Sequence, residues 1–307
     1  MNEKQNPTKK KQKVKKQFNI YKLFTILLLI VLLVVIGVLV RNWYVQNTAE
    51  KQYEDLAAQV NRLQNSMNDN AISVPSQTEE ATQGVDTEES TQSADDSELD
   101  QLGISVPKKD FDWDALHAVN PDIYAWITIP GTNIDYPVLQ NATDDSYYLR
   151  YNMNGTRGYP GCIYTEKINR KDFTDFDTVV YGHNMRDDSM FATLHYFEDS
   201  AFFANCPYIY VYEENKVLVY EIFAAYEGDN MHILYSNDFT TPSGRQIYLD
   251  KIYNKAGSGA NVRTDVQATE QSHVLTLSTC VKGRSQNRFL VQAVLLNEDE
   301  LYFGDEL

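Results

Sequence analysis

The stretch YAWITIPGTNIDYPVLQ, residues 124–140, decides the fold class because it holds two strand-forming runs separated by a turn. Residues 124–129 and 134–140 are rich in apolar and β-branched side chains, which pack well on a pleated sheet. Between them, the sequence PGTN at 130–133 combines residue types that favour turns. The stretch therefore predicts two consecutive strands, and similar runs elsewhere in the chain extend the pattern.

Six further runs have a strand-like composition, and they lie at residues 161–165, 178–181, 208–212, 217–226, 274–279 and 289–296. Isolated helices interrupt them. Residues 112–119 are expected to form a short helix, and a second helix begins at Thr241, an N-cap residue type, and ends before Gly257. About eight strands at short intervals predict a mainly β fold, in which a closed β-barrel carries helical insertions.

The N-terminus differs in charge from the rest of the chain. Residues 1–22 contain eight lysines and one glutamate, so they carry about +7 of a total formal charge of −16 and leave about −23 for the remainder. An uncharged apolar run, FTILLLIVLLVVIGVLV at 24–40, follows directly. At about 1.5 Å per residue, a helix over residues 23–41 is just long enough to span a hydrocarbon core.

This apolar run has two interpretations, a retained membrane anchor or a cleaved signal peptide. The apolar segment of a signal peptide is about 7 to 15 residues long and ends at a small-residue cleavage site. Here the run is longer and leads into Arg41, Asn42 and Trp43. We therefore expect a single transmembrane helix in the cell membrane. The positive-inside rule makes residues 1–22 a basic cytoplasmic tail and places the rest of the chain outside.

Residues 42–105 are expected to connect the anchor to a folded domain. Apolar residues recur at spacings of mostly three and four over 42–67, which predicts a stalk helix, either exposed on its own or paired in a short coiled coil. Residues 69–100 contain ten acidic residues and no Lys or Arg, so we expect 68–105 to be a disordered acidic linker. The folded domain then comprises residues 106–307.

Composition excludes several classes of function. A chain with a pI near 4.7 lacks the clustered cations that supply most of the affinity for nucleic acids. The three cysteines, Cys162, Cys206 and Cys280, form no CxxC pair and are too few for a disulfide framework. The carboxylates show no spacing typical of a calcium loop. We therefore expect no metal, no cofactor and no nucleic-acid partner.

Cys280 is the best candidate for a nucleophile. It ends the strand-like run HVLTLSTC and precedes the polar sequence VKGRSQN, which we expect to be a loop. A strand end holds a side chain rigidly while leaving it open to a substrate. Alternation along the strand places Ser278 on the same face as Cys280. We expect Cys162 and Cys206 to be buried structural thiols.

A cysteine nucleophile needs a basic partner, and His183 occupies a matching position after the apolar run TVVYG. His273 is excluded, because seven extended residues place it roughly 23 Å from Cys280. A cation for the oxyanion is offered by Arg284, in the expected loop, or by Arg288, at the start of the last strand. The remaining histidines, expected to be surface or structural residues, are His117, His195 and His232.

Three of these sequences together resemble the sortases, a family of membrane-anchored cysteine transpeptidases of Gram-positive bacteria. They are TLSTC at 276–280, YGHNM at 181–185 and RFLVQA from Arg288. The sequence at 120–140 and the helix at 241–255, placed before the last two strands, resemble class B sortases in particular. The resemblance covers about residues 110–296.

The resemblance implies an eight-stranded sortase-type β-barrel and a role for each site residue. The Cys280 thiolate would attack the carbonyl after the Thr of a C-terminal sorting motif, with His183 as its imidazolium partner and Arg288 at the oxyanion. Ser278 and Thr279 would line the substrate groove. The implied partners are surface proteins with a sorting signal and an amine of the peptidoglycan or of a pilin lysine. An extracytoplasmic cysteine protease and a catalytically silent wall-binding module stay open as alternatives.

Overall fold

The computed structural model describes residues 7–71, 99 and 102–301. Its first element, α1 (Pro7–Ala71), is a single α-helix that contains both the predicted transmembrane helix and the predicted stalk. The boundary between the two compact units of the chain, Met1–Thr48 and Ala49–Leu307, falls within α1. Most of the predicted acidic linker, 68–105, lies outside the described residues.

The apolar side chains of α1 between Phe24 and Val40 are exposed. Helical backbone suits a lipid environment because its hydrogen bonds are satisfied within the helix. Among the described residues, one helical segment, Tyr21–Val60, is able to cross a membrane by its length and composition. This segment is a candidate for the predicted anchor.

The later part of α1 packs against the β-structure of the second unit. One face of the helix is buried, and its residues are each at most 6% exposed, namely Ala49, Tyr53, Leu56 and Val60. The Tyr53 ring meets the Tyr136 ring edge-on at a centroid distance of 5.6 Å, and the Tyr53 hydroxyl donates to the Gly161 carbonyl at 2.8 Å. Residues 49–60 are thus neither an exposed stalk nor a coiled-coil surface, because the barrel covers their apolar face.

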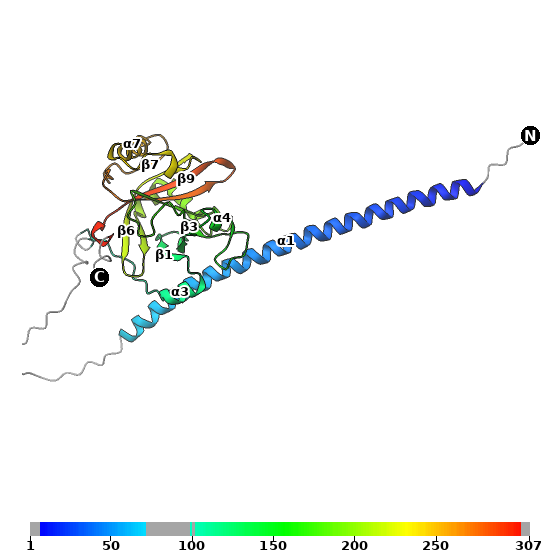
Figure 1. Ribbon diagram of the computed structural model, residues 1–307, viewed down its shortest axis with the longest axis horizontal. Coiled ribbons are helices and arrows are strands. Elements are labelled where there is room, and N and C mark those ends of the chain that lie inside the picture. The colour runs from blue at the N-terminus through cyan, green and yellow to red at the C-terminus, as the bar shows by residue number, and fades with distance from the viewer. Residues whose placement is uncertain (1–6, 72–98, 100–101, 302–307) are drawn as a thin grey trace, which may run out of the picture. The chain divides into compact units, whose positions relative to one another are not determined.

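The second unit is built around a closed β-barrel (Figure 1). Its strands follow the order β5-β1-β2-β3-β4-β8-β9-β6, and a pairing between β5 and β6 closes the ring of eight. The short strand β7 pairs with β6. The predicted mainly β, eight-stranded barrel is confirmed. The strands are β1 (Ile123–Thr128), β2 (Asp135–Leu139), β3 (Ile163–Thr165), β4 (Asp177–Tyr181), β5 (Tyr208–Tyr212), β6 (Val217–Asp229), β7 (Asn261–Val262), β8 (Val274–Val281) and β9 (Arg284–Leu295).

Two strand pairings position the candidate site. The predicted pair at 124–140 is the antiparallel β1–β2 hairpin, whose turn contains Gly131 at a φ of +81°, a conformation that favours glycine. The second pairing joins β4 and β8 in parallel, with Tyr181 opposite Ser278. Because parallel strands end at the same edge, the residues that follow β4 lie beside the C-terminal end of β8.

Helices interrupt the strands at the two predicted places and at several others. Asp112 caps α3 by accepting from the Ala115 amide at 2.9 Å, and Thr241 caps α7 by accepting from the Gly244 amide at 3.2 Å. The shorter helices have no sequence pattern long enough to predict them. Over residues 102–301, the helical elements are α3 (Trp113–Val119), α4 (Tyr147–Arg150), η1 (Ala192–Glu198), α5 (Ser200–Asn205), α6 (Ile233–Ser236), α7 (Pro242–Tyr253) and η2 (Glu298–Leu301).

Residues 281–287 correct one expectation, because they belong to a β-hairpin and not to a loop. Strand β8 continues to Val281, β9 begins at Arg284, and Val281 is paired with Arg284. The turn holds Gly283 at a φ of +77°. Polar side chains hid this strand from a search for apolar runs, since Arg284, Ser285 and Gln286 at the start of β9 are exposed. Arg284 therefore lies on a strand.

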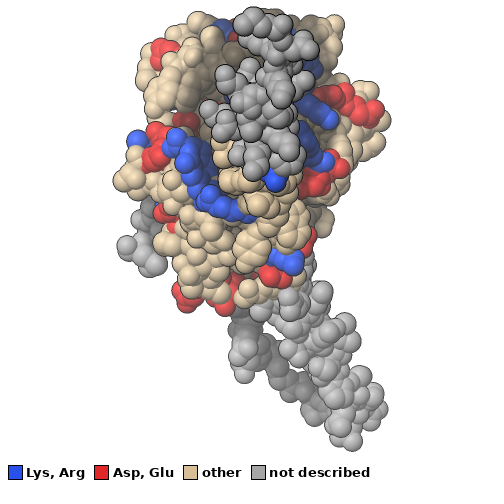
Figure 2. All heavy atoms as spheres, turned by 90° about the vertical axis from the view of Figure 1, so that its right-hand side faces the viewer, with Lys and Arg blue, Asp and Glu red and all other residues tan. Residues whose placement is uncertain are grey.

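The outer surface of the molecule carries charges of both signs. On the face shown in Figure 2, acidic side chains border the basic ones. This mixture accords with the composition of the chain, which has 27 Lys and Arg residues against 43 Asp and Glu residues.

Candidate active site

The three cysteines differ in their access to solvent. Cys280 is exposed near the end of β8, whereas Cys162 is buried and Cys206 is partly buried. Burial raises the pKa of the Cys162 thiol to about 12, and burial also raises the pKa of Cys206. Because the thiolate is the reactive form of cysteine, both thiols are poor nucleophiles at neutral pH. Cys280 is the thiol that a substrate can reach.

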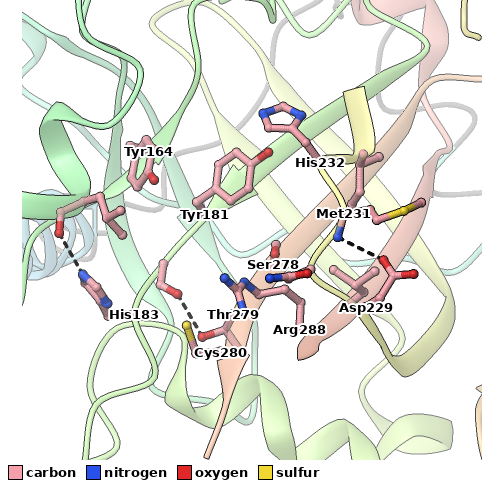
Figure 3. A pocket seen from close by; sticks show the side chains of 15 residues that line it. Tyr164, Tyr181, His183, Asp229, Met231, His232, Ser278, Thr279, Cys280 and Arg288 are labelled. Atoms are coloured by element: carbon pink, nitrogen blue, oxygen red, sulfur yellow. Dashed lines mark hydrogen bonds between the residues drawn. The ribbon is translucent and has the colours of Figure 1, made fainter. Parts of the chain in front are cut away.

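Cys280 lines a cavity of about 220 Å³ at the edge where β4 and β8 end (Figure 3). The wall of the cavity includes the end of β8, the facing part of β9 and the segment that follows β6. Gly182 and His183, which follow β4, also line it. Ser278, Thr279 and Cys280 all line it, and alternation along the strand places the side chains of Ser278 and Cys280 on one face. Apolar and aromatic side chains complete the wall, namely Leu149, Tyr164, Tyr181, Met231, Ile233 and Leu290.

Arg288 is the cation that the fold brings to this cavity. The β8–β9 register places Arg288 directly opposite Cys280. The two residues are eight positions apart in the chain, and the hairpin turn lies between them. The guanidinium of Arg288 donates from Nη1 to the carbonyls of Ser285 and Asn287 at 3.1 and 2.8 Å. Its side chain is thereby held along β9 beside the nucleophile (Figure 3).

Arg284 lies nearer the hairpin tip and has a different partner. Its Nη1 is 2.6 Å from the Glu227 carboxylate, and its side chain is 60% exposed. It is not among the residues that line the cavity. The two arginines that the sequence left as alternatives therefore occupy different environments, because the strand register separates them.

Thr279 links β8 by a hydrogen bond to the segment that carries His183. Its side chain is buried, and its hydroxyl donates to the Gly182 carbonyl at 2.9 Å. Gly182 allows this close packing, since a Cβ at that position would lie 2.6 Å from the Phe191 ring. The contact holds Gly182 against Thr279. These two residues directly precede His183 and Cys280.

His183 lines the same cavity, and its imidazole contacts the segment before β3. Its Nε2 lies 2.9 Å from the Leu149 carbonyl, and its ring meets Tyr159 edge-on at 5.0 Å. A carbonyl only accepts, so Nε2 carries a proton and the unprotonated nitrogen of the neutral ring is Nδ1. Burial lowers the pKa of His183, and the bond to Leu149 opposes this effect. The direction of this shift favours the neutral imidazole, and the imidazolium partner stays a prediction.

Two polar residues that the sequence did not single out contact the main chain of the nucleophile. Asn184 donates from Nδ2 to the carbonyl of Cys280 at 2.8 Å. His195 of η1, expected to be a surface or structural residue, has its Nε2 3.1 Å from the same oxygen and its Nδ1 2.6 Å from Glu198. The sequence signal for this pair was the three-residue spacing of His195 and Glu198. Such a spacing brings two side chains together only when the segment is helical, as η1 is.

The other histidines are dispersed. His232 lines the cavity and pairs through Nε2 with Glu166 at 2.7 Å, while burial raises the pKa of the Glu166 carboxyl and His232 opposes that shift. His273 precedes β8, at the strand end opposite to Cys280, and its Nδ1 lies 3.1 Å from the Asp175 carbonyl. Within the described parts of the chain, no three His, Cys, Asp or Glu residues are grouped so that they could hold a metal ion.

Comparison with known proteins identifies the family. A model of the sortase domain matches residues 127–296, which contain β8, β9 and the residues after β4. The chain belongs to the sortase family. Among curated relatives, this sortase is 33% identical over 186 residues to sortase B of Listeria monocytogenes, covering 60% of this chain and 73% of the relative. It is 27% identical over 195 residues to sortase B of Staphylococcus aureus, covering 60% and 74%.

Solved structures place this sortase in class B. Sortase B of Clostridium perfringens matches with a TM-score of 0.55 and 32% identity, over 61% of this chain and all of that one. A Staphylococcus aureus sortase B–substrate complex matches with a TM-score of 0.53 and 27% identity, over 59% and 83%. All the residues that line the cavity around Cys280 lie within the family match at 127–296.

Proposed function

We propose that this sortase is a membrane-anchored cysteine transpeptidase that cleaves a C-terminal sorting motif after Thr and transfers the protein to an amine. The observation that carries the proposal is the position of the exposed Cys280 thiol, opposite Arg288 on β9 and in one cavity with His183. Nucleophilic acyl transfer needs these three types of group at one place, which a wall-binding module without catalysis does not.

The first half of the reaction forms a thioester. The sulfur of Cys280 attacks the carbonyl carbon after Thr, and the thiol proton passes to His183, whose Nδ1 is free to take it. The bond to the leaving amine then breaks, the electron pair of the tetrahedral oxyanion re-forms the carbonyl, and His183 returns the proton to the amine. The products are a thioacyl enzyme and the free C-terminal fragment.

The second half transfers the acyl group. An incoming amine attacks the thioester, His183 accepts the proton that the amine loses, and the carbon–sulfur bond breaks to release Cys280. Arg288 supplies hydrogen bonds to the oxyanion in both halves, and its place on a rigid strand keeps it aligned. Ser278 lines the groove beside the motif, and Thr279 supports the groove from within the sheet.

The proposed setting is the outer face of the cell membrane. The candidate span in α1 is preceded by the lysine-rich residues 1–22, which the positive-inside rule assigns to the cytoplasm. The barrel would then meet secreted proteins that carry a sorting signal and the amine of a peptidoglycan precursor or of a pilin lysine. Anchoring enzyme and substrates at one surface raises their effective concentration.

A transfer assay tests the function directly. The full-length protein in detergent is incubated with a panel of sorting peptides and with amine acceptors, and the products are followed by mass spectrometry. We expect cleavage after Thr and a product joined to the added amine. Cleavage at an unchanged rate with only the hydrolysed peptide, at every amine concentration, would make the protein a cysteine protease. The absence of any cleavage, together with an unreactive Cys280, would favour a wall-binding module.

A further inference from the structure

The β8–β9 ladder is irregular at the nucleophile. The register shifts between Cys280, which is opposite Arg288, and Val281, which is opposite Arg284. Such an irregularity turns the main chain locally and leaves it less constrained by the ladder. The carbonyl of Cys280 accepts a hydrogen bond from the Asn184 side chain at 2.8 Å. A side chain from another segment thus holds the backbone at the point where the register of the ladder shifts.

Asn184 is also tied to His183, because it is the next residue in the chain. The two residues belong to a closed loop, in which the Phe191 amide donates to the His183 carbonyl at 2.9 Å and Asn184 forms a β-bridge with Met190. Rotation of the loop would therefore move His183 and Asn184 together. One amide group links the main chain of Cys280 to the loop that carries His183.

The pair of His195 and Glu198 supports this link from η1. His195 Nε2 lies 2.9 Å from Asn184 Nδ2 and 3.1 Å from the Cys280 carbonyl, and its ring stacks on Phe289 at 4.8 Å. When His195 is neutral, its Nδ1 donates to Glu198 and its Nε2 accepts from Asn184. His195 thereby orients the Asn184 amide group that donates to the Cys280 carbonyl.

We propose that Asn184, supported by His195 and Glu198, is a positioning residue that fixes the Cys280 main chain relative to His183. This inference rests on the proposed function, in which the two side chains exchange a proton. A reacting geometry must be held to within roughly 0.5 Å, and a displacement of about 1 Å can lower a rate about 100-fold. Neither Asn184 nor His195 needs to touch the substrate for this effect.

The test compares variants of the full-length protein in detergent. Asn184→Ala removes the donor, and Asn184→Asp keeps the shape of the side chain but offers only acceptors to the Cys280 carbonyl. We expect kcat to fall about 10- to 100-fold in both variants with little change in KM. The pH profile of Cys280 alkylation by iodoacetamide should move as well. His195→Ala should lower kcat less, since the Asn184 bond remains.

Asn297→Ala provides a matched control. Asn297 also donates to a main-chain carbonyl, that of Val217 at 2.7 Å, but it lies beside the start of β6 and away from the cavity. We expect a lower Tm with an unchanged kcat and an unchanged alkylation profile. If both Asn184 variants keep the wild-type kcat and alkylation profile, or if they lose activity only in proportion to a loss of folded protein, the positioning role is wrong. Transpeptidation by Cys280→Ala would instead overturn the proposed function.

Discussion

At the scale of single residues, the reactivity of a thiol in this protein depends on its burial. Cys162 is surrounded by core side chains, and its pKa is raised to about 12 for that reason. Cys280 has no such cover and faces a cavity that also contains His183 and Arg288. The same residue type therefore serves as packing in one place and as the candidate nucleophile in another.

Replacing Cys280 or His183 with alanine should abolish transpeptidation while the barrel stays folded. Each change removes one half of a pair that transfers a proton and forms a bond in one step, so the double variant should be little worse than either single variant. Rates from mass spectrometry and folding by circular dichroism provide the measurements. Substantial activity in Cys280→Ala would remove Cys280 from the role of nucleophile.

The two arginines should differ strongly in their effect on the rate. Losing a preorganised oxyanion donor costs about 100- to 1,000-fold, so we expect a loss of that order for Arg288→Ala and little recovery in Arg288→Lys, which lacks the planar fork. Arg284→Ala breaks an exposed ion pair with Glu227 and should stay within about tenfold of wild type. The opposite ranking, with both variants folded, would transfer the oxyanion role to Arg284.

At the scale of elements, a buried polar network joins β4, β8 and β9 to α7. Tyr248 of α7 donates to the Asp177 carboxylate at 2.8 Å, and Gln292 donates to Tyr248 and to Thr276 at 2.7 and 3.0 Å. Burial raises the pKa of Asp177 to about 7, although hydrogen bonds from Thr276 and Tyr248 oppose the shift. Between about pH 4 and pH 7, the folded protein therefore keeps a proton on Asp177 that the unfolded chain has released.

This network predicts that part of the stability declines as the pH rises. An unfolded Asp has a pKa of about 3.9, so between about pH 4 and pH 7 the folded state binds more protons at this site than the unfolded state. The free energy of unfolding should fall over that range. Asp177→Asn has no proton to lose, and we expect it to gain stability relative to wild type at pH 8 compared with pH 5.

Urea unfolding of both proteins at pH 5 and pH 8 measures this difference. Asp144→Asn is the control, because the Asp144 side chain is 44% exposed and its pKa is lowered mainly by Ser146, so that variant should show no relative gain at pH 8. An equal difference between Asp177→Asn and wild type at the two pH values would contradict the assignment of a buried, protonated carboxyl.

At the scale of the whole molecule, the position of α1 limits where the chain can be shortened. Removal of residues 1–105, the boundary that the sequence predicts, deletes the buried face of α1 that packs against the barrel. A buried Leu or Val contributes about 1.5 to 3 kcal/mol, so the chain 106–307 should unfold at lower urea concentration than the chain 49–307. Leu56→Ala in the longer chain should cost about 2 to 5 kcal/mol. Gln59→Ala, on the exposed face, should cost little free energy of unfolding. Equal stability of the chains 106–307 and 49–307 would contradict the packing of α1.

Topology is the second property of the whole molecule that can be tested. Lysines crowd one side of the apolar run, whereas the other side is acidic, so we expect the barrel outside the cell. Protease added to intact cells stripped of their wall should then degrade the barrel and spare a cytoplasmic control. Protection of both proteins would reverse the proposed orientation.

Local sequence patterns determined the features that depend on residues a few positions apart. The apolar run at 24–40, the strands around the PGTN turn, the short helix near 112–119 and the cap at Thr241 were all predictable, because strand and helix propensity and capping are short-range effects. The position of Cys280 at a strand end was accessible for the same reason. A barrel of eight strands followed from their number and spacing, with the family resemblance in support.

Only the tertiary structure decided which residues meet. The hairpin register places Arg288 opposite Cys280, the parallel pairing of β4 with β8 places His183 at the same edge, and η1 places His195 against the nucleophile's carbonyl. The burial of Tyr53 against Tyr136 likewise joins segments more than 80 residues apart. These contacts depend on strand register and barrel closure, which arise from the packing of the whole chain and leave no pattern in any short stretch of it.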